Sequence, residues 1–221
     1  MQRHALIIGL GQFGMSTARA LASYGVEVIA VDTKQSRVDE AGDFCSEALC
    51  FDARDSDDLA GTAPARRDLC LCAVGDEGRE SNILITAMLR EMGATRVIAR
   101  ATDALHARIL TLVGAHEVVN PEAAFGQRLA ARLAHRGILD ELDLGDDLVF
   151  TELLTPPVFV GRTLIELALP ERHGVTVVGL RHKSGTERRL VKLDPRRPLS
   201  ADDTLLIVAP AGAVHDLTRR V

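Results

Sequence analysis

The sequence predicts an α/β protein in which a doubly wound parallel sheet is followed by a small α+β domain. Three observations support this prediction. The first half alternates short β-branched runs with helix-like stretches, a G-x-G-x-x-G motif joins the first run to the first helix, and the last third is rich in short strand patterns. Because 221 residues can bury two modest hydrophobic cores, we expect two domains.

Six strands and the helices between them make up the predicted parallel sheet. Apolar residues recur at intervals of three and four in the helical stretches, most clearly over residues 13–24 and 80–92. Gly25 and Gly93 follow these two helices and suit the left-handed conformation of a helix C-cap. The predicted strands cover residues 5–9, 27–32, 47–51, 69–74, 96–100 and 117–120.

Residues 121–144 are predicted to be a bridging helical segment, because Phe125, Leu129, Leu133, Ile138 and Leu142 are spaced as an apolar stripe. Residues 145–221 are predicted to form a small α+β domain with little room for an active site of its own. Its strands are expected at 148–154, 175–181, 189–191 and 204–209, its short helices at 163–169 and 212–220, and a hairpin turn at 183–186.

Composition and charge exclude several classes of protein. Hydrophobic residues make up 47% and charged residues 26%, which is typical of a soluble globular protein rather than a disordered one. A formal net charge of −5 disfavours binding to nucleic acid. No segment reaches transmembrane length, so we expect a cytoplasmic protein. Cys45, Cys50, Cys70 and Cys72 are interpreted as reduced thiols rather than zinc ligands or disulfides, the last two on one face of a strand.

The glycine motif runs from Gly9 to Gly14, between a predicted strand and a predicted helix, which is the context in which it binds nucleotides. Gly9 permits the tight turn, Gly11 lets the backbone approach a phosphate, and Gly14 lets the helix pack close to the strand. N–H groups at the helix start then bind the anion. Asp32 ends the second strand, where its carboxylate can accept hydrogen bonds from ribose hydroxyls and disfavours the 2′-phosphate of NADP. Residues 1–120 are therefore predicted to be a Rossmann-type nucleotide-binding domain.

Other strand ends face the same crevice in a doubly wound sheet. Asp52 and Ala53 are expected at the adenine. Gly75 is expected where the backbone comes close to the ligand. Arg100 is expected at a phosphate, or else in a surface ion pair. Glu122 is expected at a ribose or at a divalent cation bound to phosphates, or else as a helix N-terminal acid. Glu122 is also the one predicted metal ligand, and no catalytic residue is predicted. The predicted cofactor-binding residues are Gly9, Gly11, Gln12, Phe13, Gly14, Asp32, Thr33, Lys34, Asp52, Ala53, Ala73, Val74, Gly75, Asn82, Arg100 and Glu122.

The chain resembles the regulators of potassium conductance, the RCK proteins, which are KtrA- and TrkA-type subunits of potassium channels and transporters. The order and spacing of short motifs along essentially the whole chain carry the resemblance. These motifs are Gly9-Leu-Gly-Gln-Phe-Gly, Ala30-Val-Asp, Asp52-Ala53, Ala73-Val-Gly, Asn82 through Leu89-Arg-Glu-Met, Val113-Gly-Ala, Asn120-Pro-Glu, Gly161-Arg-Thr-Leu and Asp202-Asp-Thr-Leu.

The resemblance implies a regulatory subunit rather than an enzyme. Such a subunit dimerises through its Rossmann domain, assembles into a ring that is often an octamer, and docks on the cytoplasmic face of a KtrB- or TrkH-like membrane potassium transporter. ATP or ADP would occupy the crevice, with NAD(H) as the alternative. Gln12 stands where KtrA-type members often carry an arginine that reaches the terminal phosphate of ATP. Because glutamine lacks the charge to detect a third phosphate, NAD(H) stays a strong alternative to ATP and ADP.

The second domain resembles a C-terminal module that in some members binds cyclic di-AMP or a metal ion. The alternative interpretation of its many basic residues is a solvated face. These residues are Arg162, Arg172, Arg181, Lys183, Arg188, Arg189, Lys192, Arg196 and Arg197.

Two other functions compete with a regulatory subunit. An NAD-dependent oxidoreductase would use the same crevice. However, Tyr24, the one tyrosine, ends the first helix, and we find no His or Lys at a plausible catalytic position. A redox-sensing repressor would pair the Rossmann domain with a helix-turn-helix, which the strand-rich C-terminal region disfavours.

Overall fold

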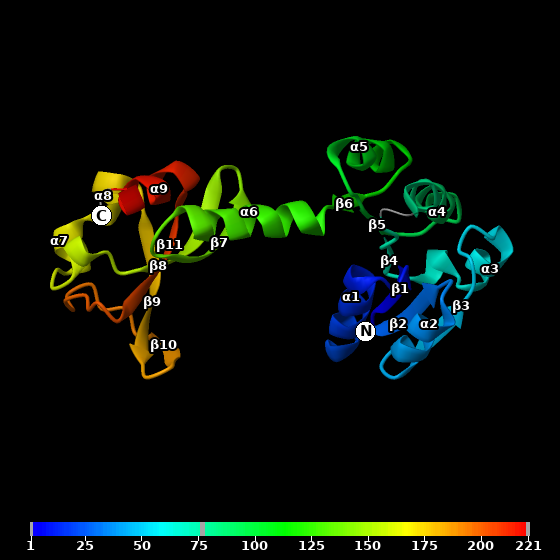
Figure 1. The fold of residues 1–221 in the computed structure, drawn as a ribbon, viewed down its shortest axis with the longest axis horizontal. Coiled ribbons are helices and arrows are strands. Elements are labelled where there is room, and N and C mark those ends of the chain that lie inside the picture. The colour runs from blue at the N-terminus through cyan, green and yellow to red at the C-terminus, as the bar shows by residue number, and fades with distance from the viewer. Residues whose placement is uncertain (1, 76–77, 220–221) are drawn as a thin grey trace. The chain divides into compact units, whose positions relative to one another are not determined.

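The computed structural model describes residues 2–75 and 78–219, which divide into two compact units, Met1–Ala123 and Ala124–Val221 (Figure 1). Each unit has hydrophobic clusters of its own. In the described part of the chain, no helix has the length and hydropathy that crossing a membrane requires.

The first unit is a six-stranded sheet in the order β3-β2-β1-β4-β5-β6, with every neighbouring pair parallel. This order reverses direction between β1 and β4, which creates the crevice of a doubly wound fold there. The strands are β1 (His4–Ile8), β2 (Glu27–Asp32), β3 (Glu47–Cys50), β4 (Leu69–Cys72), β5 (Val97–Arg100) and β6 (Glu117–Val119). The helices between them are α1 (Gln12–Ser23), α2 (Gln35–Gly42), α3 (Ser56–Gly61), the 3-10 turn η1 (Pro64–Arg66), α4 (Arg79–Glu91) and α5 (Ala104–Leu112).

Alternate residues of each strand cover opposite faces of this sheet, as the two-residue period of a strand requires. Ala5 and Ile7 of β1 belong to a cluster with residues of α1 and α2. Leu6 and Ile8 belong to another cluster, which includes residues of α3 and α4. The sheet is therefore buried on both faces, which explains the nearly continuous apolar strands of the first half.

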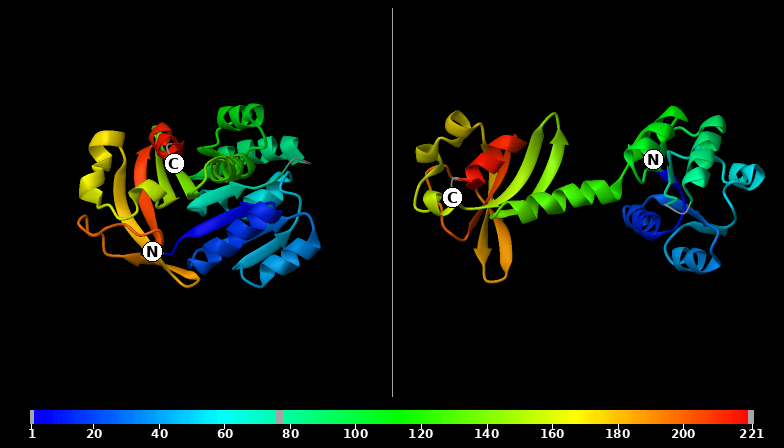
Figure 2. Two further views of the ribbon diagram at one scale, coloured as in Figure 1. Left: turned by 60° about the vertical axis from the view of Figure 1, so that its left-hand side comes forward. Right: turned by 45° about the horizontal axis from the view of Figure 1, so that its top comes forward.

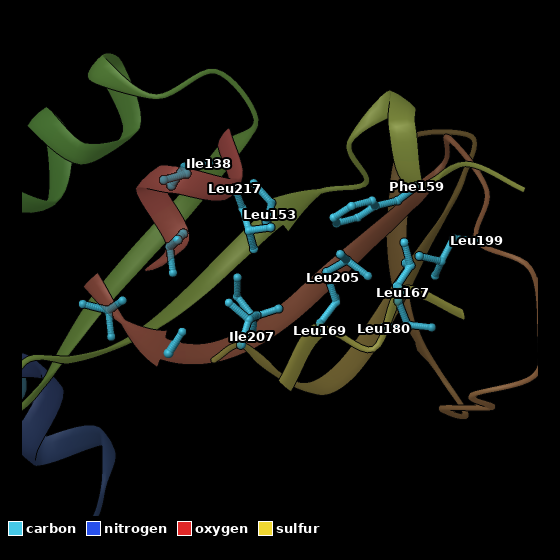
Figure 3. Packing of buried hydrophobic residues seen from close by; sticks show 14 residues of the cluster. Ile138, Leu153, Phe159, Leu167, Leu169, Leu180, Leu199, Leu205, Ile207 and Leu217 are labelled. Atoms are coloured by element: carbon cyan, nitrogen blue, oxygen red, sulfur yellow. The ribbon is translucent and has the colours of Figure 1, made fainter. Parts of the chain in front are cut away.

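The second unit contains a five-stranded antiparallel sheet in the order β10-β9-β11-β8-β7. Figure 3 shows Leu153, Leu180, Leu205 and Ile207 from three of its strands in one cluster with Leu217. The chain enters it through α6 (Pro121–Ala134) and continues as β7 (Ile138–Gly145), β8 (Leu148–Leu154), η3 (Pro157–Phe159), α7 (Leu164–Leu167), α8 (Leu169–His173), β9 (Thr176–Ser184), β10 (Glu187–Val191), β11 (Asp203–Pro210) and α9 (Ala211–Arg219).

The helical prediction for residues 121–144 is wrong in its second part. Helix α6 ends at Ala134, Gly137 takes a positive φ of 94°, and Ile138 begins strand β7, which runs beside β8 (Figure 2). Ile138 and Leu142 therefore do not continue the apolar stripe of α6. The last predicted helix extends to residue 220, which lies outside the described residues.

Candidate functional site

A crevice of about 680 Å³ lies at the carboxyl ends of β1, β2, β3 and β4. Loops that follow these strands supply its walls, as expected at the point where the strand order reverses. Its lining combines backbone of the glycine motif with apolar side chains such as Ile8, Phe51 and Ile85. Asp32, Asp52 and four cationic side chains complete the wall. The cavity therefore offers apolar surface for a ring system and charges for polar groups.

The glycine motif forms the tight turn between β1 and α1. Gly9 has a φ of 91°, and a Cβ there would lie 3.0 Å from the Val74 amide nitrogen. A Cβ on Gly14 would lie 1.9 Å from the Gly9 carbonyl oxygen, so only glycine lets α1 start this close to the turn. At Gly11 a Cβ would meet nothing within 4 Å, which leaves that backbone open on the cavity side. Helix α1 begins without a side-chain cap, so its first N–H groups are available to an anion.

Asp32 ends β2 and is 7% exposed. Its Oδ2 atom accepts a hydrogen bond from the Leu10 N–H at 2.7 Å, and its Oδ1 atom accepts one from the Lys34 N–H at 2.9 Å. The Arg37 Nη1 atom lies 3.3 Å from Oδ2. The carboxylate therefore ties the glycine turn to the end of β2 and still lines the crevice.

Asp52 follows β3 and is clamped by Arg54. The Arg54 Nε atom donates to both carboxylate oxygens at 3.0 Å, and the Arg54 N–H donates to Oδ1. These hydrogen bonds hold the pKa of Asp52 below its usual value and raise the pKa of Arg54. Asp52 is therefore an oriented, ionised acceptor at the edge of the crevice.

Arg100 ends β5 and its side chain is 15% exposed. It forms an ion pair with Glu122, in the first turn of α6. Its Nε atom is buried and has no hydrogen-bond partner among the described residues. A Cβ on Gly75 would lie 3.0 Å from Arg100 Nη1, so the glycine leaves room for the guanidinium. Arg100 therefore places a guanidinium on the crevice wall, where it suits a phosphate oxygen.

The structure brings most of the predicted site residues to this crevice and places a few elsewhere. Gln12 lines a neighbouring cavity instead, and Phe13 packs against the α1 side of the core. Asn82 is fully buried and donates to the carbonyls of Val74 and Arg100 at 2.9 Å, so it supports the wall from behind. Gly14 lies against the Gly9 carbonyl, and Glu122 forms an ion pair with Arg100. The predicted residues on the wall are Gly9, Gly11, Asp32, Thr33, Lys34, Asp52, Ala53, Ala73, Val74, Gly75 and Arg100.

Arg37 and Arg54 line the crevice but are not among the predicted residues. Both follow a predicted strand-end aspartate, Arg37 by five residues and Arg54 by two. That spacing is the signal that could have found them, since a cation so close to a strand-end carboxylate is positioned to pair with it.

The described residues include no group of three or more His, Cys, Asp and Glu side chains that could hold a metal ion. All four cysteines are free thiols. Cys70 and Cys72 are buried in the same cluster, as predicted for one strand face, and burial raises the pKa of each thiol to about 12.

Two family models match the chain. The model of the TrkA-N domain matches residues 5–121, and the model of the TrkA-C domain matches residues 150–221. The chain is also 29% identical over 219 residues to Ktr system potassium uptake protein C of Bacillus subtilis, covering 99% of this chain and 96% of the relative. It is 33% identical over 205 residues to Ktr system potassium uptake protein A of Vibrio alginolyticus, covering 92% and 91%.

Solved structures share the fold. The crystal structure of the GsuK RCK domain matches with a TM-score of 0.68 at 19% identity, covering 99% of this chain and 47% of that chain. The GsuK channel bound to NAD matches with a TM-score of 0.67 at 19% identity, covering 96% and 38%. The chain thus spans less than half the length of these two structures, whereas it spans nearly the whole of both Ktr proteins.

Proposed function

The chain belongs to the family of proteins that combine a TrkA-N with a TrkA-C domain, and from this we propose that it is the nucleotide-sensing regulatory subunit of a potassium uptake system. The full-length similarity to two Ktr potassium uptake proteins supports this role. The observation that carries the nucleotide-sensing part is the crevice itself, with an open glycine turn, the Asp32 carboxylate and the Arg100 guanidinium in its lining.

The crevice residues fit an adenine nucleotide, for which we propose ATP or ADP, with NAD(H) as the alternative. Gly11 and the start of α1 would hold the phosphates, because bare N–H groups at a helix start bind anions. Asp32 would accept hydrogen bonds from the ribose, and Asp52 would accept one from the adenine amino group. The NAD-bound GsuK channel has the same fold, which is consistent with this family of ligands.

A divalent cation would enter this site only together with the nucleotide. Glu122 is the one carboxylate proposed for it, and Arg100 holds that carboxylate in an ion pair. A single carboxylate does not make a magnesium site, which is usually completed by phosphate oxygens and water. Glu122 would therefore have to exchange Arg100 for the cation when phosphates arrive.

Regulation requires that the nucleotides distinguish two states of the assembly. Each nucleotide shifts the populations of open and closed transporter only by its difference in affinity for the two states. We propose that the chain dimerises through its first unit, forms a ring, and docks at the cytoplasmic face of a KtrB- or TrkH-like membrane subunit. The similarity to two Ktr potassium uptake proteins supports the proposal of a membrane partner.

For the second unit we propose cyclic di-AMP as a ligand to be tested. A cavity of about 690 Å³ within that unit is lined by four arginines together with Phe125 and Leu129. Two of the arginines are paired, Arg128 with Asp140 and Arg181 with Glu152. Calorimetric titration of the full chain with cyclic di-AMP decides this proposal, and absence of heat at millimolar ligand removes it.

Replacing Asp32 with alanine is the direct test of the nucleotide site. We expect adenine nucleotide affinity to fall by more than about tenfold, because charge-assisted hydrogen bonds to the ribose are lost and the Leu10 N–H of the glycine turn loses its acceptor. The measurement is isothermal titration calorimetry with ATP, ADP and NADH. Asp39→Ala is the matched control, since Asp39 is an exposed carboxylate of α2 that accepts a hydrogen bond from Gln35 outside the crevice. Unchanged affinity in the Asp32 variant would refute the site.

Potassium uptake tests the function as a whole. The chain and its membrane partner are expressed in a host that lacks its own uptake systems, with and without the Asp32→Ala change. We expect nucleotide-dependent uptake with the unaltered chain and loss of that dependence in the variant. Uptake that is identical with and without the chain would contradict a regulatory subunit, and oxidation of a substrate with stoichiometric NADH production would favour an oxidoreductase.

A further inference from the structure

Arg37 occupies a position that none of the roles above uses. It is the third residue of α2, its side chain is 40% exposed, and its Nη1 atom lies 3.3 Å from Asp32 Oδ2. It lines the nucleotide crevice and also a neighbouring cavity of about 750 Å³, which the crevice meets at Gly11 and Arg37. The guanidinium therefore has space on two sides of the carboxylate that it now contacts.

The hydrogen bonds of Asp32 indicate that a ribose must displace Arg37. A carboxylate has about four lone-pair positions. Leu10 N–H and Lys34 N–H occupy two of them at 2.7 and 2.9 Å, and Arg37 occupies a third at 3.3 Å. Two ribose hydroxyls need two positions, so one donor has to leave. The backbone donors are fixed by the fold, whereas the long, half-exposed Arg37 side chain can move.

When no ribose hydroxyl displaces it, Arg37 stays beside Asp32, where the ribose is proposed to bind. Lys34 and Arg54 also line the crevice, so three cations share its lining with the carboxylates of Asp32 and Asp52. Arg54 is engaged by Asp52 through three side-chain hydrogen bonds, which leaves Arg37 as the freer guanidinium. A planar guanidinium matches a phosphate with two parallel hydrogen bonds, which a lysine ammonium cannot provide.

We propose that Arg37 determines how the crevice treats the 2′ position of the adenosine ribose, and that it lets the site accept 2′-phosphorylated nucleotides beside those with a free 2′-hydroxyl. With a free hydroxyl, Asp32 accepts its hydrogen bond and Arg37 turns away into the neighbouring cavity. With a 2′-phosphate, Arg37 stays and offsets the repulsion from Asp32. This inference rests on the proposed nucleotide site and replaces the sequence-based expectation that Asp32 alone disfavours NADP.

The experiment compares ligand pairs that differ only in the 2′-phosphate. NADH is titrated against NADPH, and ADP against 2′-phospho-ADP, into the full chain and into Arg37→Ala and Arg37→Lys. We expect the alanine variant to bind the 2′-phosphorylated ligands at least about tenfold more weakly, the loss expected for one charge-assisted hydrogen bond. The ligands without the 2′-phosphate should bind equally or more tightly, since a competitor for Asp32 is gone. The lysine variant should fall between.

Arg96→Ala is the matched control, because Arg96 is an exposed arginine that pairs with Glu117 and lines neither cavity. It should leave all four affinities unchanged, and thermal unfolding should show that each variant is folded. Equal weakening of both members of a ligand pair in Arg37→Ala would overturn the inference, as would an unaltered chain that fails to bind either 2′-phosphorylated ligand. If the unaltered chain binds neither NADH nor ADP, the proposed nucleotide site itself fails.

Discussion

Gly14 shows how a single hydrogen atom in place of a methyl group decides the geometry of the site. A methyl group at this position would lie 1.9 Å from the Gly9 carbonyl oxygen, which is far below any contact distance, and the backbone fixes the positions of both. Any larger residue would push α1 away from the turn. The N–H groups at the start of that helix would then no longer point at a bound phosphate.

Gly14→Ala should therefore lower the free energy of unfolding by roughly 1–3 kcal/mol, the usual cost of overpacking. It should also abolish nucleotide binding in calorimetry. Gly42→Ala is the control, because Gly42 ends α2 and a Cβ there would meet nothing within 4 Å. That change should be neutral or stabilise the protein by up to about 1 kcal/mol. A stable, nucleotide-binding Gly14 variant would show that the turn tolerates a wider approach.

Spacing alone fixes where some of the predicted site residues lie in the crevice. Gly9, Gly11 and Asp32 sit at defined positions of a strand–turn–helix unit, and the crevice contains all three. The spacing of Arg37 and Arg54 from Asp32 and Asp52 indicates ion pairs, but only the fold shows that both side chains line the crevice, so they are missing from the prediction. Asn82 is predicted at the ligand, whereas the fold buries it behind the wall to satisfy two strand-end carbonyls.

At the scale of elements, strand β7 shows why its sequence predicts a helix. Its pairing with β8 shifts register between Ile138 and Asp140, so the apolar residues of the strand do not follow a clean two-residue period. Ile138 and Leu142 happen to stand four residues apart, which matches a helix as well. β7 is an edge strand in the sheet order, and edge strands tolerate exposed acidic residues. The acidic residues of β7 make its strand pattern hard to recognise in the sequence. The six parallel strands, by contrast, are predictable because each is a short, apolar run.

Asp203 anchors the start of β11 and is fully buried. It accepts hydrogen bonds from Arg197 at 2.7 Å and from the Ser200 N–H at 2.8 Å, and His182 Nδ1 lies 2.8 Å away. Burial by itself raises the pKa of Asp203, but the hydrogen bonds from Arg197, Ser200 and His182 outweigh it and leave the pKa below its usual value.

Asp203→Asn should destabilise the second unit by roughly 2–3 kcal/mol at neutral pH, because asparagine offers Arg197, Ser200 and His182 one uncharged acceptor oxygen where the Asp203 carboxylate offers two. A depressed folded pKa stabilises the fold above the unfolded pKa and ceases to do so as the pH falls through the folded pKa. The stability gap between the unaltered chain and the variant should therefore narrow below about pH 4. Denaturant unfolding at several pH values measures this gap. The control is Asp202→Asn, at the exposed neighbouring residue, which should show no stability gap to the unaltered chain. A gap for Asp203→Asn that does not change with pH would contradict the charged role of Asp203.

At the scale of the whole molecule, the exposed apolar face of α6 in the second unit supports a ring contact in addition to the dimer contact proposed for the first unit. Phe125 is 63% exposed and Leu133 is 77% exposed, on the same side as Leu129. Contiguous apolar surface of this kind is usually covered in solution.

Multi-angle light scattering should therefore give a mass several times that of the 23.8 kDa chain. Replacing Phe125 and Leu133 together with aspartate should lower that mass, since two charges would have to be buried at the contact. Ile165→Asp is the control at an exposed apolar residue of α7. A strict monomer at micromolar concentration would count against a ring, and an unchanged mass in the double variant would place the contact elsewhere.

During evolution, the Asp32 carboxylate would be hard to replace, because it has both a structural role and a proposed binding role. The same oxygen atom that would recognise a sugar also anchors the peptide of Leu10. A substitution of Asp32 would change ligand binding and would also remove the acceptor that holds the glycine turn at Leu10. Homologues that no longer bind the ligand would therefore need a second substitution that restores the turn. Diversification of ligand preference is easier at neighbouring side chains that contact only the cavity.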